Sequence, residues 1–430
     1  MKTVSFVTLG CKVNQYDSQA MLERFEQAGY QAVPASQPAD VCVVNTCTVT
    51  GTGDKKSLQQ LRRCLRKNPG AAVIAAGCLA QRMGKSLLDL GVRLVIGNQH
   101  RGQVVELLEQ ALRENTSLCA VESLEAVPYE RLMIHSHEGF TRAVMKIQEG
   151  CDNHCTYCII PSVRGGIRSR SLEDIQAEAR ELAQAGFQEI VLTGIHLTSY
   201  GRDLPEKPSF ADAVKKVCET EGIFRVRLGS LEPRVATETF ARELSQSPKV
   251  CPQFHLALQS GSDSVLRRMK RAYNTEQFRL ACERIRRYWP DTAFTTDVIV
   301  GFPGETEEEF QETLDFCREI GFAKIHVFPF SPREGTPAAG MEEQCPESLK
   351  AQRVHRLLAL GEELRRNYCA RFLGRVAEVL FEEPGENGLM MGYTPEYIPV
   401  YSENVLPGKR IRVVLTEATE DGILGMPIQD

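Results

Sequence analysis

The chain has little that would place it in a membrane or draw it to a polyanion by bulk charge. None of its apolar runs approaches the roughly 20 residues that a membrane-spanning helix needs. Residues 1–10 form a short strand-like run without the basic flank and apolar core of an export signal. The net charge of −5 gives no global attraction for nucleic acid. We therefore expect a cytoplasmic protein with no membrane partner, which would hold any nucleic acid through local basic patches.

Cysteine, by contrast, is plentiful. The 430 residues include 15 cysteines, an odd number in a chain without an export signal. Such thiols are more often metal ligands or small buried hydrophobes than disulfide partners. The length exceeds what one hydrophobic core usually holds, so we expect two or three domains in a reducing compartment.

The first 112 residues predict a small parallel α/β domain. Three apolar runs alternate with two helix-like stretches, over residues 4–9, 17–27, 41–45, 55–67 and 71–76. Alternation of strand and helix is typical of a parallel sheet. Each of the three strand-like runs is closely followed by a cysteine, and loops beyond the carboxyl ends of such strands bind ligands.

A polar linker, residues 113–136, precedes a second unit over residues 137–367. Six strand-like runs, each followed by a helical segment, occupy residues 143–147, 189–192, 225–228, 255–258, 293–300 and 324–328. Six β/α units in series predict a partial barrel with its chemistry at the carboxyl ends of the strands.

The last unit, residues 368–430, changes character again. Short strand-like runs at residues 376–381, 398–401, 410–415 and 422–427 are separated by Gly, Pro and Asn turns. This pattern is typical of a small all-β barrel. The fold class is thus α/β, with an amino-terminal parallel domain, a central six-unit (β/α) partial barrel and a terminal all-β barrel.

Cys151, Cys155 and Cys158 stand on one loop after the first barrel strand. Three thiolates can hold three irons of a [4Fe-4S] cluster and leave the fourth iron open for S-adenosylmethionine (SAM). The alternative is a structural zinc site, which needs a fourth ligand. His154 could supply it, but its place between two of the cysteines would strain a tetrahedral site.

A CxxxCxxC motif in this position resembles the radical SAM superfamily. The resemblance implies a turn after the second strand for the methionyl amino group, a carboxylate after the third for the ribose, and residues after the fourth and fifth strands and in the cysteine loop for the adenine. The SAM-binding residues implied are Tyr157, Thr193, Gly194, Ser230, Glu232, Gln259 and Asp297.

A second set of cysteines, Cys11, Cys47 and Cys78, follows the three amino-terminal strands. Side chains at neighbouring parallel strand ends can converge although they are far apart in sequence. Convergence would build a second cluster with a free iron, and the flanking Asn, Thr and Gly residues suit hydrogen bonding to sulfur. The alternative is that each is a buried hydrophobe, which is the usual role of an isolated cysteine.

Taken together, the two sets resemble the methylthiotransferase family over essentially the whole chain, including a terminal TRAM domain. Residues 8–18 are similar to the branch that acts on N6-threonylcarbamoyladenosine at position 37 of tRNAs reading codons that begin with A. The resemblance implies two [4Fe-4S] clusters and two equivalents of SAM. One SAM would methylate a sulfur on the second cluster, and the other would yield the radical that takes the hydrogen from C2.

The resemblance also implies a sulfur source and an electron donor such as flavodoxin or ferredoxin. Two alternative substrates stay open, an aspartate of a ribosomal protein and isopentenyladenosine in tRNA. A third hypothesis is an iron–sulfur RNA-binding protein that catalyses no reaction.

Local basic patches could bind RNA phosphates, although such runs are often only solvated helix faces. The candidates are residues 55–67, residues 267–287, and Arg164, Arg168 and Arg170. The terminal barrel has five basic residues against ten acidic ones, so RNA binding there would rest on a local edge or on aromatic stacking. The residues in question are Arg375, Lys409, Arg410, Arg412, Tyr393, Tyr397 and Tyr401.

Overall fold

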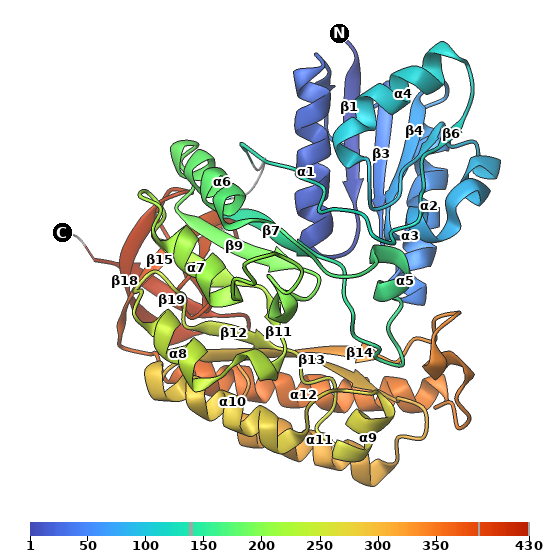
Figure 1. Ribbon diagram of the computed structural model, residues 1–430. Helices are drawn as coiled ribbons and strands as arrows, with labels where there is room; N and C mark the ends of the chain where they lie inside the picture. Colours follow the sequence, from blue (N-terminus) through green and yellow to red (C-terminus); the bar gives the residue numbers. More distant parts are fainter. Residues whose placement is uncertain (137–140, 386–387, 429–430) are drawn as a thin grey trace.

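The computed structural model describes residues 1–136, 141–385 and 388–428. Its amino-terminal domain is a six-stranded parallel sheet of order β2-β1-β3-β4-β5-β6, which confirms the expected class (Figure 1). The strands are β1 Thr3–Thr8, β2 Gln31–Ala32, β3 Val41–Thr46, β4 Ala72–Gly77, β5 Leu94–Val95 and β6 Leu118–Cys119. β6 lies in the stretch expected to be a linker, so the sheet extends further along the chain than residue 112.

Helices cover both faces of this sheet. They are α1 Lys12–Gln27, α2 Gly51–Lys67, α3 Cys78–Met83 and α4 Val104–Arg113, with 3-10 turns η1 Gly84–Leu90 and η2 Arg101–Gln103. Alternate residues of β3 point to opposite sides. Val43 packs in the core with Phe25 of α1 and Leu108 of α4, whereas Val44 packs with Leu61 of α2. Burial on both faces explains why β3 and β4 read as continuous apolar runs.

All six strand-like runs expected for the central unit are strands. The full set is β7 Ala143–Glu149, β8 Arg168–Ser169, β9 Glu189–Gly194, β10 Arg225–Leu228, β11 Ser230–Leu231, β12 Gln253–Leu256, β13 Ala293–Val300 and β14 Lys324–Pro329. They form two four-stranded sheets, β10-β9-β7-β8 and β11-β12-β13-β14. The chain passes from the first sheet to the second at Gly229, between β10 and β11. A partial barrel results, and β14 is its last strand.

The helices of the central unit are α5 Ile160–Arg164, α6 Leu172–Gln184, α7 Phe210–Cys218, α8 Glu238–Ser245, α9 Asp263–Arg268, α10 Thr275–Tyr288, α11 Glu307–Ile320 and α12 Glu347–Ala370, with 3-10 turns η3 Leu197–Ser199, η4 Pro233–Val235 and η5 Pro337–Gly340. Most of them cover the outside of the partial barrel, whereas α5 packs against α3 of the amino-terminal domain. Thr306 caps α11 in a reciprocal hydrogen-bonded pair with Glu309, which satisfies free backbone amides at the start of the helix. The expected start of this unit, residue 137, lies outside the described residues.

The terminal unit is a closed barrel of order β15-β16-β17-β19-β18. Its strands are β15 Val376–Pro384, β16 Met390–Tyr393, β17 Pro399–Ser402, β18 Arg410–Ala418 and β19 Ile423–Pro427. β16 was not expected, because its residues, Met390–Tyr393, include a glycine and show no alternation of apolar and polar side chains. The expected end of the unit, residue 430, lies outside the described residues.

The terminal barrel docks on the core through arginines. Arg225 of β10 donates to the Tyr393 carbonyl at 3.0 Å and the Glu378 carbonyl at 2.7 Å. Arg375 pairs with Asp291 at 2.7 Å, and Arg410 donates to Gln188 at 2.8 Å. Arg375 and Arg410, which the sequence offered as RNA contacts, are therefore engaged in holding the domains together.

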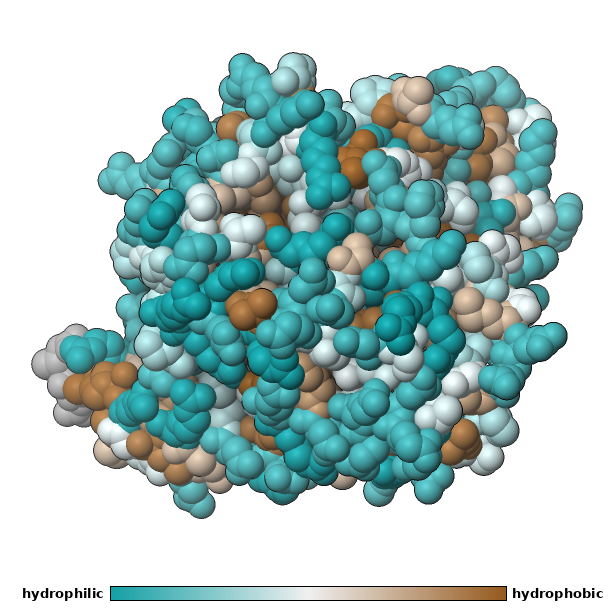
Figure 2. Space-filling view, turned by 60° about the horizontal axis from the view of Figure 1, so that its bottom comes forward, coloured by the Kyte–Doolittle hydropathy of each residue, from teal (hydrophilic) through white to brown (hydrophobic). Residues whose placement is uncertain are grey.

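The surface in Figure 2 is largely hydrophilic, with hydrophobic side chains singly or in small groups on the face shown. Among the described helices, none is long and apolar enough to cross a membrane.

Candidate functional site

The loop that carries Cys151, Cys155 and Cys158 begins at Gly150, directly after β7. Gly150 has a φ of 72°, and a Cβ at this position would lie 1.8 Å from the Gly166 carbonyl oxygen, so only glycine fits. The Cys151 amide donates to the Gly165 carbonyl at 3.0 Å, and the Thr156 amide donates to the Met269 carbonyl at 3.1 Å. The loop is thus fixed at its start and middle to the body of the barrel.

Glu232 is the centre of a polar cluster beside this loop. Its carboxylate accepts from Asn153 at 2.9 Å and from Arg271 at 2.8 Å, and its second oxygen lies 3.4 Å from His196 Nε2. Burial opposes ionisation of Glu232, but the hydrogen bond with His196 and the charge of Arg271 outweigh it and hold its pKa at about 2. Glu232 is therefore an ionised acceptor at neutral pH.

A cavity opens between the cysteine loop and the carboxyl ends of the strands. All three cysteines line it. So do five of the seven residues implied for SAM binding, namely Tyr157, Ser230, Glu232, Gln259 and Asp297. The other two, Thr193 and Gly194, are not among its lining residues; they end β9 immediately before Ile195 and His196, which are.

Two thiols of this loop, those of Cys151 and Cys158, are poor acids. Burial raises the pKa of Cys151 to about 11 and that of Cys158 to about 12, and the neighbouring Cys155 adds to both. All three cysteines line one cavity, so their side chains lie on the same side of the loop. Three thiols are the donor set of a [4Fe-4S] cluster with one open iron, whereas a structural zinc ion needs a fourth ligand.

Cys11, Cys47 and Cys78 also converge. They stand after β1, β3 and β4, which pair side by side in parallel. Burial raises the pKa of Cys47 to about 11, and Cys78 and Cys11 both add to this shift. A Cβ on Gly10 would lie 3.2 Å from the Cys47 sulfur, so the chain needs a residue without a side chain there. The three cysteines therefore lie at the carboxyl ends of neighbouring strands.

The two cysteine sets are neighbours in space. Cys78 packs against Ile159 and Val163, and Ile159 directly follows Cys158 of the other set. Arg164, at the end of α5, donates its Nε to the Cys78 sulfur at 3.2 Å. One short segment therefore joins the two sets.

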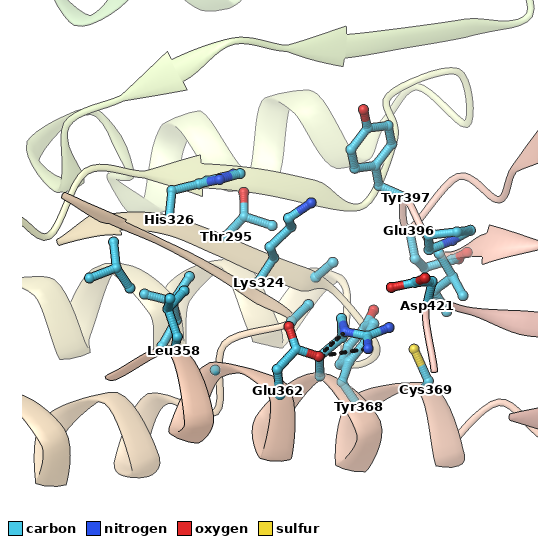
Figure 3. A pocket seen from close by; sticks show the side chains of 18 of the residues that line it. Thr295, Lys324, His326, Leu358, Glu362, Tyr368, Cys369, Glu396, Tyr397 and Asp421 are labelled. Carbon is cyan, nitrogen blue, oxygen red and sulfur yellow. Dashed lines mark hydrogen bonds and ion pairs between the residues drawn. The ribbon is translucent and has the colours of Figure 1, made fainter. Parts of the chain in front are cut away.

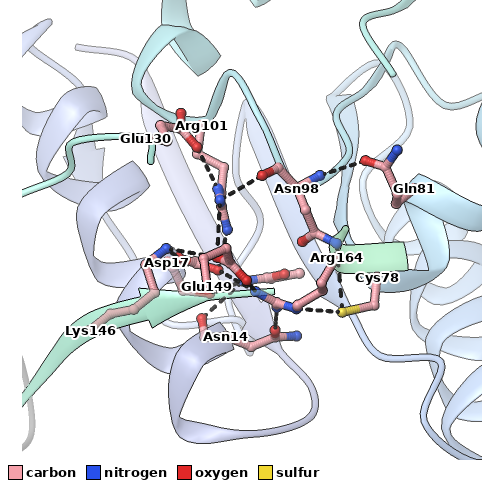
Figure 4. Close-up of polar contacts among 12 residues, drawn as sticks. Asn14, Asp17, Cys78, Gln81, Asn98, Arg101, Glu130, Lys146, Glu149 and Arg164 are labelled. Atoms are coloured by element: carbon pink, nitrogen blue, oxygen red, sulfur yellow. Dashed lines mark hydrogen bonds and ion pairs between the residues drawn. The ribbon is translucent and has the colours of Figure 1, made fainter. Parts of the chain in front are cut away.

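Figure 4 shows a buried network of charges behind this junction, built from both domains. Asp17 of α1 pairs with Arg101 and with Lys146 of β7, while Glu149 pairs with Arg164 at 2.6 Å. The side chains of these five residues are at most 3% exposed. Such charges are stable in a protein interior only when they are paired, so the network fixes the amino-terminal domain against the barrel.

In two of the basic patches proposed for RNA, arginine side chains are buried or paired with acidic residues of this chain. Arg164, Arg168 and Arg170 are buried, at 0%, 5% and 1% exposure, so the expectation that they contact phosphates is wrong. On α10, Arg279 pairs with Glu319 and Arg287 with Glu238. The third patch, on α2, is different. Lys55, Lys56, Arg62, Arg63, Arg66 and Lys67 are all exposed, and the helix begins beside Cys47.

Sequence analysis did not assign Asn153, His196 or Arg271 to the site. Arg271 was counted with a surface patch, yet its side chain is 7% exposed and donates to the Cys155 sulfur at 3.0 Å. Asn153 and His196 each lie two residues after an assigned position, Cys151 and Gly194. Only the fold brings these three to Glu232, because they come from separate loops.

Three family models match the chain. A model of the radical SAM superfamily matches residues 145–317. A model described as uncharacterized protein family UPF0004 matches residues 3–97, and a TRAM domain model matches residues 370–422. These ranges follow the three structural units.

Curated relatives are similar over nearly the whole chain. A threonylcarbamoyladenosine tRNA methylthiotransferase, MtaB, of Bacillus subtilis is 42% identical over 97% of this chain and 94% of its own. The protein of that name in Thermotoga maritima is 36% identical over 99% and 96%. A tRNA-2-methylthio-N(6)-dimethylallyladenosine synthase of Carboxydothermus hydrogenoformans is 34% identical over 97% of both chains.

Among solved structures, the radical SAM methyltransferase TsrM of Kitasatospora setae superposes with a TM-score of 0.56. The match covers 79% of this chain and 77% of that one at 14% identity. At this identity the similarity supports the fold alone.

Proposed function

Because the chain belongs to the tRNA methylthiotransferase family of radical SAM enzymes, we propose that it replaces the C2 hydrogen of N6-threonylcarbamoyladenosine in tRNA by a methylthio group. The observation that carries this proposal is the pair of converging cysteine sets, which Ile159 and Arg164 bring into contact through Cys78. A reaction that both activates SAM and delivers sulfur needs two such sites side by side.

We assign one [4Fe-4S] cluster to Cys151, Cys155 and Cys158, and a second to Cys11, Cys47 and Cys78. Each set offers three thiols and so leaves one iron for an exogenous ligand. When bound, the clusters and SAM supply an electron, a 5′-deoxyadenosyl radical and a methylated sulfur. A radical is required because no side chain can deprotonate an aromatic C–H bond at neutral pH.

The chain's own residues bind and orient SAM. Glu232, ionised at neutral pH, would accept hydrogen bonds from the ribose hydroxyls. Asn153 and Arg271 hold its carboxylate in place. Tyr157, Ser230, Gln259 and Asp297 line the same cavity, and Thr193 and Gly194 end the neighbouring strand, where their backbone can approach the methionyl group.

The nucleoside assignment rests on the curated relatives and on tRNA as the common substrate in their names. We place the reaction at position 37 of tRNAs that read codons beginning with A. A sulfur source and a reductant such as flavodoxin or ferredoxin complete the proposal, with the cytoplasm as its site.

Mass spectrometry of tRNA nucleosides from cells with and without this chain tests the assignment. We expect the methylthio form of threonylcarbamoyladenosine to disappear without the chain and its parent nucleoside to accumulate. Loss of the methylthio form of isopentenyladenosine instead would reassign the substrate. An unchanged nucleoside profile would contradict a tRNA substrate and direct attention to a ribosomal-protein aspartate.

We propose that α2 contributes phosphate contacts. Replacing Arg62, Arg63 and Arg66 by glutamine keeps the helix propensity nearly constant. The change should weaken tRNA binding and lower the slope of log affinity against log salt concentration by about 1 for each arginine that contacts a phosphate. Filter binding or fluorescence anisotropy at several salt concentrations measures both.

The matched control lies on α10. Arg279 and Arg287 are also surface arginines, but they pair with Glu319 and Glu238. Replacing these two by glutamine should leave the salt slope unchanged. Equal slopes for the wild type and the α2 variant would rule out α2 as a phosphate contact.

A further inference from the structure

Two cysteine sulfurs accept hydrogen bonds from arginines. Arg164 donates its Nε to the Cys78 sulfur at 3.2 Å, and Arg271 donates its Nη1 to the Cys155 sulfur at 3.0 Å. The structure describes all 15 cysteines, and no other one accepts a hydrogen bond from a guanidinium. One of the two belongs to each cysteine set, so each set has one sulfur with a charged donor.

An arginine near a cysteine does not by itself make such a contact. Cys369 and Arg365 both line a cavity of about 420 Å³ between β14, α12 and the terminal barrel, and Figure 3 shows Cys369 at this cavity. Arg365 pairs there with Glu362 at 2.7 Å. Within the described part of the chain, it makes no hydrogen bond to the Cys369 sulfur. The arginine contacts of Cys78 and Cys155 therefore distinguish the two cysteine sets from the other thiols.

Arg164 is fixed in place by three partners (Figure 4). While its Nε donates to Cys78, its Nη1 donates to Glu149 at 2.6 Å and its Nη2 donates to Asn14 at 2.5 Å. These partners come from α3, β7 and α1. The Arg164 side chain is 0% exposed, so no water competes with the sulfur for the guanidinium.

A second donor lies beside the same sulfur. The Nδ2 of Asn98 is 3.8 Å from the Cys78 sulfur and donates to the Val163 carbonyl at 2.7 Å. Among the described residues, no side chain donates a hydrogen bond to the sulfur of Cys11 or Cys47. Cys78 is therefore the member of its set on which the surrounding polar side chains act.

The charged network behind Cys78 has one more cation than it has carboxylates. Its members are Asp17, Glu130, Glu149, Arg101, Lys146, Arg164 and Arg168. Arg168 is the additional cation, because it is buried and bonds to the Arg164 carbonyl at 2.9 Å but makes no ion pair within the described residues. Buried charges need a partner of opposite sign. An iron–sulfur cluster held by three thiolates has a net negative charge, which matches this excess.

Positive charge and hydrogen bonds at a ligand sulfur stabilise the reduced form of an iron–sulfur cluster. Reduction adds an electron and makes the cluster more negative, so a nearby cation attracts the reduced form more strongly than the oxidised form. Hydrogen bonds to the sulfurs have the same effect. Both effects raise the reduction potential.

We infer that Arg164 raises the reduction potential of the cluster on Cys11, Cys47 and Cys78 through its hydrogen bond to the Cys78 sulfur. This inference rests on the proposed function, which assigns a cluster to these cysteines. Arg164 belongs to the barrel unit, whereas Cys78 belongs to the amino-terminal domain. The barrel thus tunes a cluster that the neighbouring domain holds.

The proposed reaction leaves one electron over at this cluster. Removal of hydrogen from C2 produces a carbon radical. When the radical joins the methylated sulfur, the C–S bond forms and the bond from that sulfur to iron breaks. Three electrons take part, and the new bond holds two of them, so the third passes to the cluster. A higher reduction potential makes this uptake more favourable.

Potentiometric titration followed by electron paramagnetic resonance tests the inference on the full chain. Replacing Cys151, Cys155 and Cys158 by alanine removes the barrel cluster, so that the second cluster is measured alone. In this background, we expect Arg164→Met to lower the midpoint potential by at least about 59 mV, or tenfold in a one-electron equilibrium. This is the size expected for one hydrogen bond to a charged group.

Three further variants separate tuning from structure. Arg164→Lys keeps the charge but cannot span all three partners, and it should lower the potential less than Arg164→Met. Asn98→Leu removes the longer contact and should also produce a smaller decrease. Arg353→Met is the matched control, because Arg353 is a buried arginine that pairs with Glu305 at 2.7 Å and has no sulfur contact. It should leave the potential at the value of the background.

An unchanged or raised potential in Arg164→Met would overturn the inference and leave the proposed function intact. If that variant does not fold, an unchanged potential in both Arg164→Lys and Asn98→Leu would overturn it. An equal decrease in Arg353→Met would also do so, because it would assign the effect to a general loosening of the fold. Absence of any iron–sulfur signal in the alanine background would instead overturn the second cluster, and with it the proposed function.

Discussion

Replacing Cys47 by alanine is expected to abolish methylthio insertion while SAM is still cleaved to 5′-deoxyadenosine. Cys47 converges with Cys11 and Cys78 at the end of the amino-terminal sheet, whereas the cavity of the other cysteine set is lined entirely by barrel residues. Loss of one of three thiolates leaves too few protein ligands for that cluster. Liquid chromatography of reaction mixtures with a chemical reductant measures both products.

The reciprocal variant is Cys155→Ala. It should abolish 5′-deoxyadenosine release and methylthiolation together, because both depend on the barrel cluster. Cys119→Ala is the matched control, since this cysteine lies on the edge strand β6 away from both sets and should leave both products unchanged. Normal methylthiolation by Cys47→Ala would refute the assignment of two clusters.

Changing Asp17 to asparagine should lower the free energy of unfolding by about 3–5 kcal/mol, the cost of removing one partner from a buried ion pair. Asp17 has a side chain 2% exposed and bonds to both Arg101 and Lys146. An amide of the same shape would leave these two buried cations with only Glu149 and Glu130 as acidic partners. Equilibrium unfolding in urea measures the change.

A double variant shows whether the loss comes from the unpaired charge. Adding Lys146→Met to Asp17→Asn removes one of the stranded cations, so the pair should cost less than the sum of the single changes. Glu130→Gln is the milder control, because its side chain is 15% exposed. A loss of under about 1 kcal/mol for Asp17→Asn would contradict the role given to this network.

The expected family, the three-unit architecture and the six barrel strands are confirmed, because the cysteine motifs and the apolar runs of the longer strands are both visible locally in the sequence. β13 and β7 are buried along most of their length, so they read as apolar runs whatever their neighbours are. Short strands do not carry such a signal. β5 and β6, with two residues each, depend on pairing with β4 and with one another.

The RNA contacts predicted from basic runs were the least accurate predictions. Arg164, Arg168 and Arg170 follow a metal-binding motif and look like a basic patch, but they are buried. The sequence around an arginine does not show whether its side chain contacts solvent, a phosphate or a buried carboxylate. Its partners, such as Glu149 for Arg164, come from elements that only the fold brings near.

The sequence by itself determined the chemistry of the cysteine loop, since Cys151, Cys155 and Cys158 are close enough along the chain for their sulfurs to reach one cluster. It also determined the order of strands and helices, through local burial patterns. Only the tertiary structure decided that Cys11, Cys47 and Cys78 stand after neighbouring strands, and that Cys78 packs against Ile159. These contacts join residues separated by tens of positions, and their positions follow from the packing of sheets and domains rather than from any local propensity.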